Sequence, residues 1–254
     1  MKNTLSAGVL LIGNELLSGS IQDKNLSHIA VTLEQRGIRV RETRIVPDIE
    51  EEIVDALNQM RSKFDYVFTT GGIGPTHDDI TSDSVAKAFG VKNVLVQEVY
   101  DIIDNYLTQK GVEFTSAAQR MAYAPQGAQM IKTERSIVPG YRIDNVFVMA
   151  GVPSIMQMML EGIIKELKTG LTILNGAVHA NVGEGEIAAA LETIQLENED
   201  IDIGSYPQDK NSEFSDYRVI FVVRGTDQKE IDTACDKILS ACQQGNYEAI
   251  RVSK

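Results

Sequence analysis

The chain has 254 residues, of which 43% are hydrophobic and 24% charged, and its formal net charge at pH 7 is −12. This is the composition of a globular protein, and no apolar run approaches the roughly 20 residues needed to cross a bilayer. The negative charge argues against a nucleic-acid binder, because binding to a phosphate backbone requires clustered Lys and Arg. We therefore predict a cytoplasmic protein without a nucleic-acid or membrane partner.

The first apolar stretch, near residues 5–12, contains polar residues and is followed by no cleavage pattern of small residues. It therefore predicts a buried strand and not a signal peptide. The two cysteines, Cys235 and Cys242, recur on one apolar helical face. They predict reduced core residues and not a disulfide framework.

Residues from about 7 to 168 alternate between strand-like and helix-like patterns. Strands are predicted near 9–12, 38–45, 65–70 and 145–150, and helices near 26–37, 48–60, 81–89, 97–109, 115–122 and 153–167. Asp48 is predicted to open the second of these helices as part of a capping box with Glu51. Such alternation predicts a parallel sheet that is covered by helices on both faces.

The pattern changes near residue 168. Strands are predicted near 174–182, 201–206 and 217–224, helices near 187–194 and 231–242, and a loop at 207–215. This βαββα order is typical of a small α+β subdomain. We therefore predict two domains, residues 1–168 and 169–254, that pack closely.

Residues 69–81 read Thr-Thr-Gly-Gly-Ile-Gly-Pro-Thr-His-Asp-Asp-Ile-Thr, and they lie between a predicted strand and a predicted helix. Glycines allow backbone N–H groups to turn toward a ligand, and the positive end of the helix dipole attracts phosphate. The adjacent carboxylates of Asp78 and Asp79 would repel a bare anion unless a divalent cation or a proton lies between them. The segment predicts a site for a phosphorylated ligand, with a metal ion.

Two common phosphate-binding templates do not fit this turn. A Walker loop ends in Gly-Lys-Ser/Thr, and no lysine occurs between Lys63 and Lys87. A dinucleotide fingerprint would place a third glycine at position 77, which is His77. The turn is therefore neither an ordinary nucleoside-triphosphatase loop nor a Rossmann loop.

A second loop, residues 13–25, follows the first strand and carries Glu15 and Asp23. Loops after parallel strands meet at one edge of the sheet, where ligands bind, so we expect these acids to face Asp78 and Asp79. A structural alternative stays open, because Asp23 and Asp48 also suit helix N-caps. Thr81 and Ser82 are likewise residues that commonly start helices.

Several segments resemble, in order, those of the molybdopterin-binding fold family, and specifically the N-terminal domain of the competence/damage-inducible CinA proteins. They are residues 13–19 with Asp23 and Asn25, Val46-Pro47-Asp48, Thr70 to Thr81, Met121 to Pro125, Val138-Pro139-Gly140 and Met149 to Pro153. Residues after 170 resemble the KH-like subdomain that accompanies CinA domains. We expect no nicotinamide-nucleotide amidase domain, which longer CinA proteins carry.

The resemblance implies an α/β protein with a three-layer α/β/α molybdopterin-binding fold and a small C-terminal α+β, KH-like subdomain. It implies a divalent-metal-dependent pyrophosphohydrolase of ADP-ribose or a related dinucleotide. The predicted catalytic residues are Asp79, Asp78 and Asp48. The predicted phosphate- or nucleotide-binding residues are Thr70, Gly71, Gly72, Gly74, Thr76, Ser18, Asp23 and Asn25. The predicted metal ligands are Asp78, Asp79 and Glu15, for Mg²⁺, Mn²⁺ or Co²⁺.

Two alternatives use the same pocket: a non-catalytic binding module for molybdopterin or a nucleotide, and a molybdopterin adenylyltransferase-like enzyme. The partner in each case is a phosphorylated small molecule, a dinucleotide or a pterin, and we expect a homo-oligomer, a dimer or trimer. RNA is not expected, because Gly183-Glu184-Gly185-Glu186 is acidic and lies between a strand and a helix. Two departures from the family pattern are Asn14, where many relatives have Asp, and Ala150, where Pro is more usual.

Overall fold

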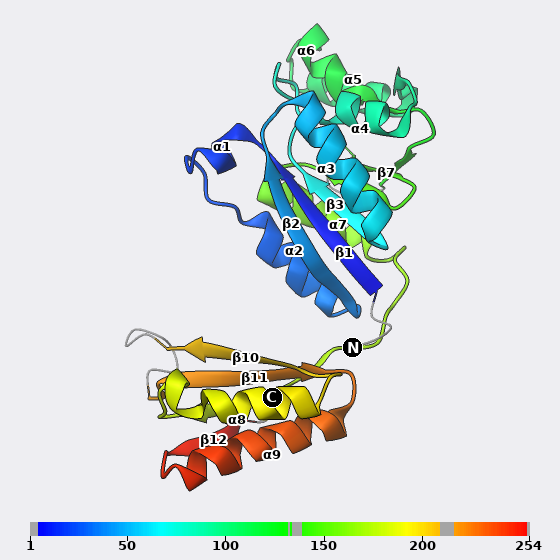
Figure 1. The fold of residues 1–254 in the computed structure, drawn as a ribbon. Coiled ribbons are helices and arrows are strands. Elements are labelled where there is room, and N and C mark those ends of the chain that lie inside the picture. Colours follow the sequence, from blue (N-terminus) through cyan, green and yellow to red (C-terminus); the bar gives the residue numbers. More distant parts are fainter. Residues whose placement is uncertain (1–4, 132, 134–138, 209–215, 253–254) are drawn as a thin grey trace. The chain divides into compact units, whose positions relative to one another are not determined.

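The computed structural model describes residues 5–131, 133, 139–208 and 216–252. It contains two compact units, an N-terminal unit of Leu5–Thr169 and a C-terminal unit that begins at Gly170 (Figure 1). Val138 and most of the predicted loop at 207–215 lie outside the described residues. No helix within the described ranges is both long and apolar enough to cross a membrane.

A six-stranded sheet with the order β2-β1-β3-β8-β7-β6 forms the centre of the N-terminal unit. Its parallel strands are β2 (Ile38–Val46), β1 (Leu5–Ile12), β3 (Tyr66–Thr70) and β8 (Val146–Met149). Two short antiparallel strands, β7 (Tyr141–Ile143) and β6 (Gln129–Met130), extend one edge. The parallel part was predicted from apolar runs. The antiparallel edge was not, because strands of two and three residues carry no periodic signal.

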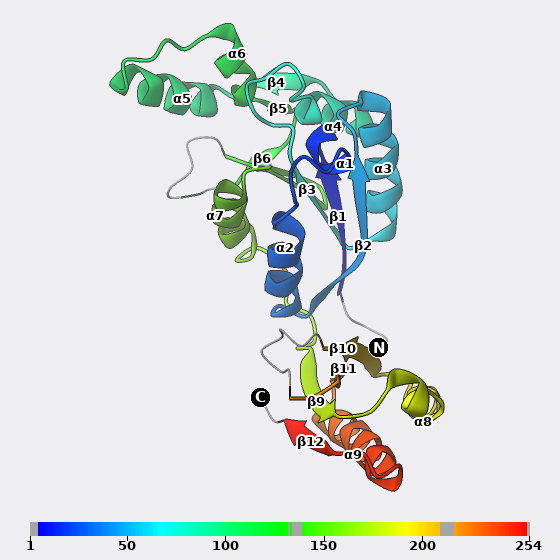
Figure 2. The ribbon, with the colours of Figure 1, turned by 90° about the vertical axis from the view of Figure 1, so that its left-hand side faces the viewer.

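Helices cover both faces of this sheet. Those on one face are α2 (Asn25–Glu34) and α7 (Pro153–Ile163), and those on the other are α3 (Glu50–Lys63) and α4 (Thr81–Phe89) (Figures 1 and 2). Each layer has its own apolar core against the sheet. On the α2–α7 side, Phe68 and Phe147 are fully buried, and their rings stack with centroids 5.2 Å apart. The predicted three-layer α/β/α architecture is thereby confirmed.

A small lobe is inserted between α4 and β6. Its elements are β4 (Asn93–Leu95), α5 (Gln97–Gln109), α6 (Ser116–Gln119), the 3₁₀ helix η1 (Arg120–Ala122) and β5 (Tyr123–Pro125). We call these residues, 93–125, the α5–η1 lobe. Its own buried cluster contains Val99, Ile103 and Ala122. The lobe therefore has a buried cluster of its own, while its Ala124 belongs to the core on the α3–α4 face of the sheet.

The predicted capping box at the start of α3 is wrong. The helix begins at Glu50, its N-cap residue is Ile49, and no side chain caps it. Asp48 instead accepts a hydrogen bond from the backbone N–H of Asn14 through Oδ2, at 2.9 Å. Asn14 begins the short helix α1 (Asn14–Leu17), so Asp48 joins the loops that follow β1 and β2. This tertiary contact replaces the local cap.

The C-terminal unit is an antiparallel sheet with the order β10-β11-β9-β12, with two helices against it (Figure 1). Its elements are β9 (Leu174–Ala180), α8 (Glu184–Glu197), β10 (Asp202–Pro207), β11 (Val219–Gly225), α9 (Gln228–Gln244) and β12 (Ala249–Val252). The final strand, β12, was not predicted, because four residues after a glycine turn give too short a pattern. Cys235 and Cys242 are buried, unpaired thiols on α9, as their spacing predicted.

Burial of His179 makes the stability of the C-terminal unit sensitive to pH. The residue lies on β9 and is 6% exposed, and burial lowers the pKa of its imidazole below the ordinary 6.5. Because the folded unit favours the neutral ring, the unfolded chain binds more protons below about pH 6.5. Stability is therefore complete above that pH and is lost as the pH falls through it.

We expect thermal unfolding to show this loss between about pH 7.5 and 5.5, and to show a smaller loss in a His179→Gln variant. His77→Gln is the matched control, because that imidazole is 96% exposed. Equal pH dependence in wild type and His179→Gln would contradict the assignment.

Candidate active site

The carboxyl ends of β1, β3 and β8 open into a cavity of about 540 Å³, which we call the larger cavity. All the predicted site residues except Ser18 line it. These residues are Glu15, Asp23, Asn25, Asp48, Thr70, Gly71, Gly72, Gly74, Thr76, Asp78 and Asp79. The structure thus brings together residues from three loops that are separated in the sequence, as expected for a ligand site at the edge of a parallel sheet.

Ser18 serves the loop and not the larger cavity. Its Oγ donates to the carbonyl oxygen of Glu15 at 3.2 Å and lies 2.8 Å from the Oγ of Ser20. The side chain therefore stabilises the turn after α1. Nothing in the sequence distinguishes this use from ligand binding.

The glycine turn, residues 71–79, is held by close backbone contacts. Gly71 and Gly72 have φ values of +104° and +68°, and a Cβ on Gly71 would lie 2.2 Å from the carbonyl oxygen of Ile12. The hydroxyl of Thr81 donates to the carbonyl oxygen of Gly71 at 2.9 Å, and its N–H donates to that of Gly72 at 2.9 Å. The first residue of α4 therefore fixes the turn, and only glycine fits at its two leading positions.

Thr81→Val tests this connection, because the substitution keeps the shape of the side chain and removes the buried hydroxyl. We expect it to lower the free energy of unfolding by about 1–2 kcal/mol, since the Gly71 carbonyl loses its hydrogen bond inside the protein. Urea denaturation measures the change. The control is Ser62→Ala, which removes an exposed hydroxyl bound to the carbonyl oxygen of Gln59 and should cost about 0.5 kcal/mol or less. Equal losses would contradict this role for Thr81.

Asp78 and Asp79 precede α4 and do not lie in its first turn, which begins at Thr81 with Ile80 as N-cap. Asp79 Oδ2 accepts from the N–H of Thr76 at 2.8 Å and from its hydroxyl at 2.5 Å. Asp78 is exposed, and the neighbouring Thr76 hydroxyl is the main cause that lowers the pKa of its carboxyl. Asp79 therefore shapes the turn, while Asp78 presents an ionised carboxylate at its surface.

The other acids of the larger cavity also contact the backbone. Asp23 accepts from the N–H of Asn25 at 3.2 Å and of Leu26 at 2.9 Å, so it caps the start of α2. Glu15 lies close to Gly13, where a Cβ would come within 2.4 Å of its Oε1. Asp48 accepts from Asn14. Asp23 and Asp48 thus each have a backbone partner, which does not exclude a ligand on the second oxygen of Asp48.

No three His, Cys, Asp or Glu side chains among the described residues are close enough to hold one metal ion together. Mg²⁺, however, commonly binds through one or two carboxylates and the phosphates of a substrate. Asp78 and Asp79 belong to the glycine turn and line the larger cavity with Gly72 and Gly74. These residues fit a cation that is shared with a bound pyrophosphate better than a preformed metal centre.

Asn25 joins the start of α2 to the loop after β8. Its Nδ2 donates to the carbonyl oxygen of Gly151 at 2.8 Å, and the residue is 4% exposed. A Cβ on Gly151 would in turn lie 3.3 Å from the Cα of Gly71. These contacts tie three walls of the larger cavity to one another.

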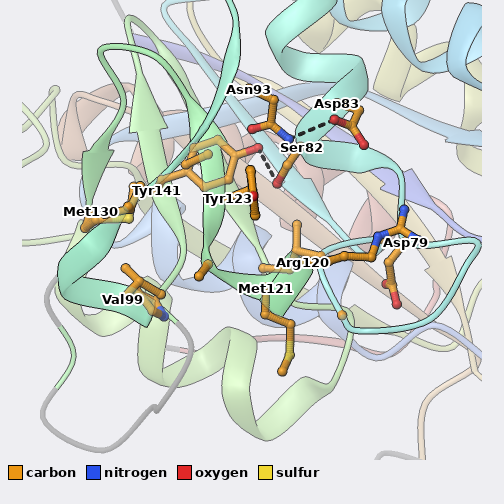
Figure 3. A pocket seen from close by; sticks show the side chains of 17 residues that line it. Asp79, Ser82, Asp83, Asn93, Val99, Arg120, Met121, Tyr123, Met130 and Tyr141 are labelled. Atoms are coloured by element: carbon orange, nitrogen blue, oxygen red, sulfur yellow. Dashed lines mark hydrogen bonds between the residues drawn. The ribbon is translucent and has the colours of Figure 1, made fainter. Parts of the chain in front are cut away.

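A second cavity of about 220 Å³, the smaller cavity, also adjoins the turn residues (Figure 3). It shares Gly72, Ile73, Gly74, Asp79 and Met121 with the larger cavity. Its remaining walls come from α4, the α5–η1 lobe and β7, and they include Asn93, Arg120 and Tyr141. Sequence reasoning missed these three residues. For Arg120 alone the sequence held an indication of a site, because this residue directly precedes the Met121–Pro125 motif.

Comparisons with known proteins agree with this fold. Residues 8–169 match the family described as "Probable molybdopterin binding domain", and residues 172–249 match that described as "FAD synthase, middle domain". The chain therefore belongs to the molybdopterin-binding domain family.

Individual relatives narrow the assignment to the CinA type. A CinA-like protein of Desulfosudis oleivorans is 38% identical over 168 residues, which cover 64% of this chain and 41% of that protein. The crystal structure of CinA from Thermoplasma acidophilum, described as of unknown function, superposes with a TM-score of 0.59 and 28% identity. The superposed region covers 64% of this chain and 98% of the chain in that structure. The N-terminal unit is thus a CinA N-terminal domain.

A protein of Archaeoglobus fulgidus shows that the similarity extends beyond this unit. It is 30% identical over 200 residues, which cover 79% of this chain and 85% of that protein.

Proposed function

We propose that the chain is a divalent-metal-dependent pyrophosphohydrolase that cleaves ADP-ribose or a related dinucleotide. The supporting observation is that the larger and smaller cavities meet at the glycine turn and at Met121 and are otherwise lined by different residues. A pyrophosphate on the turn would have a separate cavity for each of the groups it joins. A pterin or nucleotide that carries only one organic group on its phosphate would fill only one of the two cavities.

Charge around the turn favours a metal-bound form of the substrate. The larger cavity is lined by five carboxylates, and the cations lining the two cavities are Lys24 and Arg120. An anionic pyrophosphate would meet net repulsion here without a divalent cation. Asp78 and Asp79, with Glu15, would hold that cation. When bound, it would neutralise the pyrophosphate and increase the acidity of a bound water.

The remaining steps belong to the chain's own residues. Backbone N–H groups at Gly72 and Gly74 would bind phosphoryl oxygens, as in other glycine turns before helices. Asp48, whose Oδ2 accepts from Asn14, would orient the attacking water with its second oxygen. Water adds across the P–O–P linkage, and the products from ADP-ribose are AMP and ribose 5-phosphate.

The test is a substrate assay with the whole chain. ADP-ribose, FAD, NAD and ATP are incubated separately with Mg²⁺, Mn²⁺ or Co²⁺, and the products are separated by chromatography. We expect AMP to be released from ADP-ribose only when a metal is present. The absence of turnover with every combination would refute the proposal.

A non-catalytic binding module is the second candidate. Two observations favour it. Asp23, Asp48 and Asp79 accept hydrogen bonds from the backbone, and the described residues contain no group of three metal ligands. It predicts tight binding of a nucleotide or molybdopterin without turnover under any metal. Consumption of ATP that depends on molybdopterin would instead indicate an adenylyltransferase-like activity.

A further inference from the structure

The smaller cavity has two chemically different ends (Figure 3). Ser82, Asn93 and Tyr141 lie together at one end, and Arg120 and Asp79 lie at the other, beside the glycine turn. A nucleotide whose phosphate occupies the turn would therefore have its phosphate near Arg120. Its base would extend toward the neutral polar end.

Apolar side chains also line the smaller cavity. They are Val96, Val99, Met121, Ala122, Ala124 and Met130. Val99, Ala122 and Ala124 are buried. A flat heterocyclic ring suits such walls, because methionine sulfur makes favourable contacts with aromatic rings and the apolar surface leaves water. The sugar hydroxyls of a ribose would find few partners there.

The carboxamide of Asn93 has a fixed orientation. Its Nδ2 donates to Asp83 Oδ1 at 2.8 Å, and a carboxylate accepts hydrogen bonds but has none to give. The nitrogen must therefore face Asp83. The other atom of the amide, Oδ1, is buried and has no hydrogen-bond partner. It is an acceptor that a donor on a ligand would satisfy.

Ser82 supplies the complementary group. The hydroxyl of Tyr141 donates to Ser82 Oγ at 3.2 Å, and Tyr141 is 3% exposed. Since Ser82 accepts this bond, its own hydroxyl hydrogen remains for a ligand acceptor. The polar end thus offers an acceptor from Asn93 beside a donor from Ser82.

We propose that the smaller cavity binds the base of the substrate nucleotide and selects one that carries an amino group next to a ring nitrogen, as adenine does. The adenine amino group would donate to Asn93 Oδ1, and a ring nitrogen would accept from Ser82. In DNA recognition a single asparagine amide supplies both an acceptor and a donor to adenine; here Ser82 would supply the donor, because Asn93 Nδ2 faces Asp83. Hypoxanthine replaces the amino group with a carbonyl oxygen, which would face the Asn93 acceptor. This inference depends on the proposed function in one respect, namely that the phosphate of the ligand binds at the glycine turn.

The test measures binding of AMP and IMP by titration calorimetry, which requires no turnover. We expect the wild-type chain to bind AMP about tenfold more tightly than IMP, the effect of roughly one hydrogen bond. Asn93→Leu, of similar size without the acceptor, should reduce that ratio to about one. Gln97→Ala is the matched control, because Gln97 Nε2 donates to Asp101 Oδ1 at 2.7 Å in an exposed pair outside both cavities. It should keep the wild-type ratio.

The outcomes separate this inference from the proposed function. Equal binding of AMP and IMP, no binding of AMP, or a preference that survives Asn93→Leu would overturn the base pocket. If ADP-ribose is nevertheless hydrolysed, the proposed function is supported and the base pocket is not. If no dinucleotide is hydrolysed but AMP is preferred in wild type and not in Asn93→Leu, the base pocket stands and the hydrolase does not.

Discussion

We expect the Asp79→Asn variant to release AMP from ADP-ribose at least about 100-fold more slowly than the wild-type chain, with metal and substrate saturating. Asn retains an oxygen that can accept from the N–H and hydroxyl of Thr76, so the glycine turn should keep its shape. The substitution removes the negative charge and replaces the second carboxylate oxygen with an NH2 group. A large loss of rate would therefore report the loss of a group that holds the metal and pyrophosphate.

The matched control for this variant is Asp55→Asn, which removes a carboxylate from an exposed position on α3, outside both cavities. It should retain the wild-type rate. Thermal unfolding of both variants shows whether the fold is intact. A wild-type rate in Asp79→Asn would eliminate this residue as a metal ligand.

The Gly71→Ala variant should lose about 3 kcal/mol or more of unfolding free energy, measured by urea denaturation. Two costs add at this position. The φ of +104° is unfavourable for any residue with a side chain, which costs about 1–3 kcal/mol. The new Cβ would also lie 2.2 Å from the Ile12 carbonyl oxygen, and relieving that contact costs roughly another 1–3 kcal/mol because backbone must move.

Gly19→Ala separates these two costs. Gly19 has a φ of +72°, and nothing lies within 4 Å of the position its Cβ would take. Only the conformational cost applies, so we expect a loss of about 1 kcal/mol. Similar losses in the two variants would mean that the approach of Gly71 to β1 does not constrain the turn.

Features with a local signal were predictable from the sequence. The parallel strands appear as apolar runs, and the helix from Thr81 to Phe89 begins and ends where its pattern indicated. The glycine turn was located correctly between β3 and α4, because a strand, three glycines and a helix start adjoin in the chain. The meeting of the loops after β1, β2 and β3 at the larger cavity followed from the rule that parallel strands direct their loops to one edge.

Features that depend on distant residues were not predictable. Asp48 matches a local capping pattern, yet its partner is Asn14, 34 residues earlier. Asn93 and Tyr141 belong to three-residue strands, and neither sits in a motif that marks a site. Their common cavity exists only because the α5–η1 lobe folds against α4 and β7. A pattern of residues that are close together in the sequence does not indicate such a contact between distant segments.

The separate core of the α5–η1 lobe has a consequence for how such proteins diversify. The lobe buries Val99, Ile103 and Ala122 among its own residues, while it supplies Arg120 and Met121 to the smaller cavity. A substitution at Arg120, which belongs to neither core of the sheet, can therefore alter the polarity of that cavity without removing a side chain from those cores. Under the two proposals made above, Asn93 and Arg120 of the lobe would contribute to ligand selection, while the glycine turn would hold the phosphate.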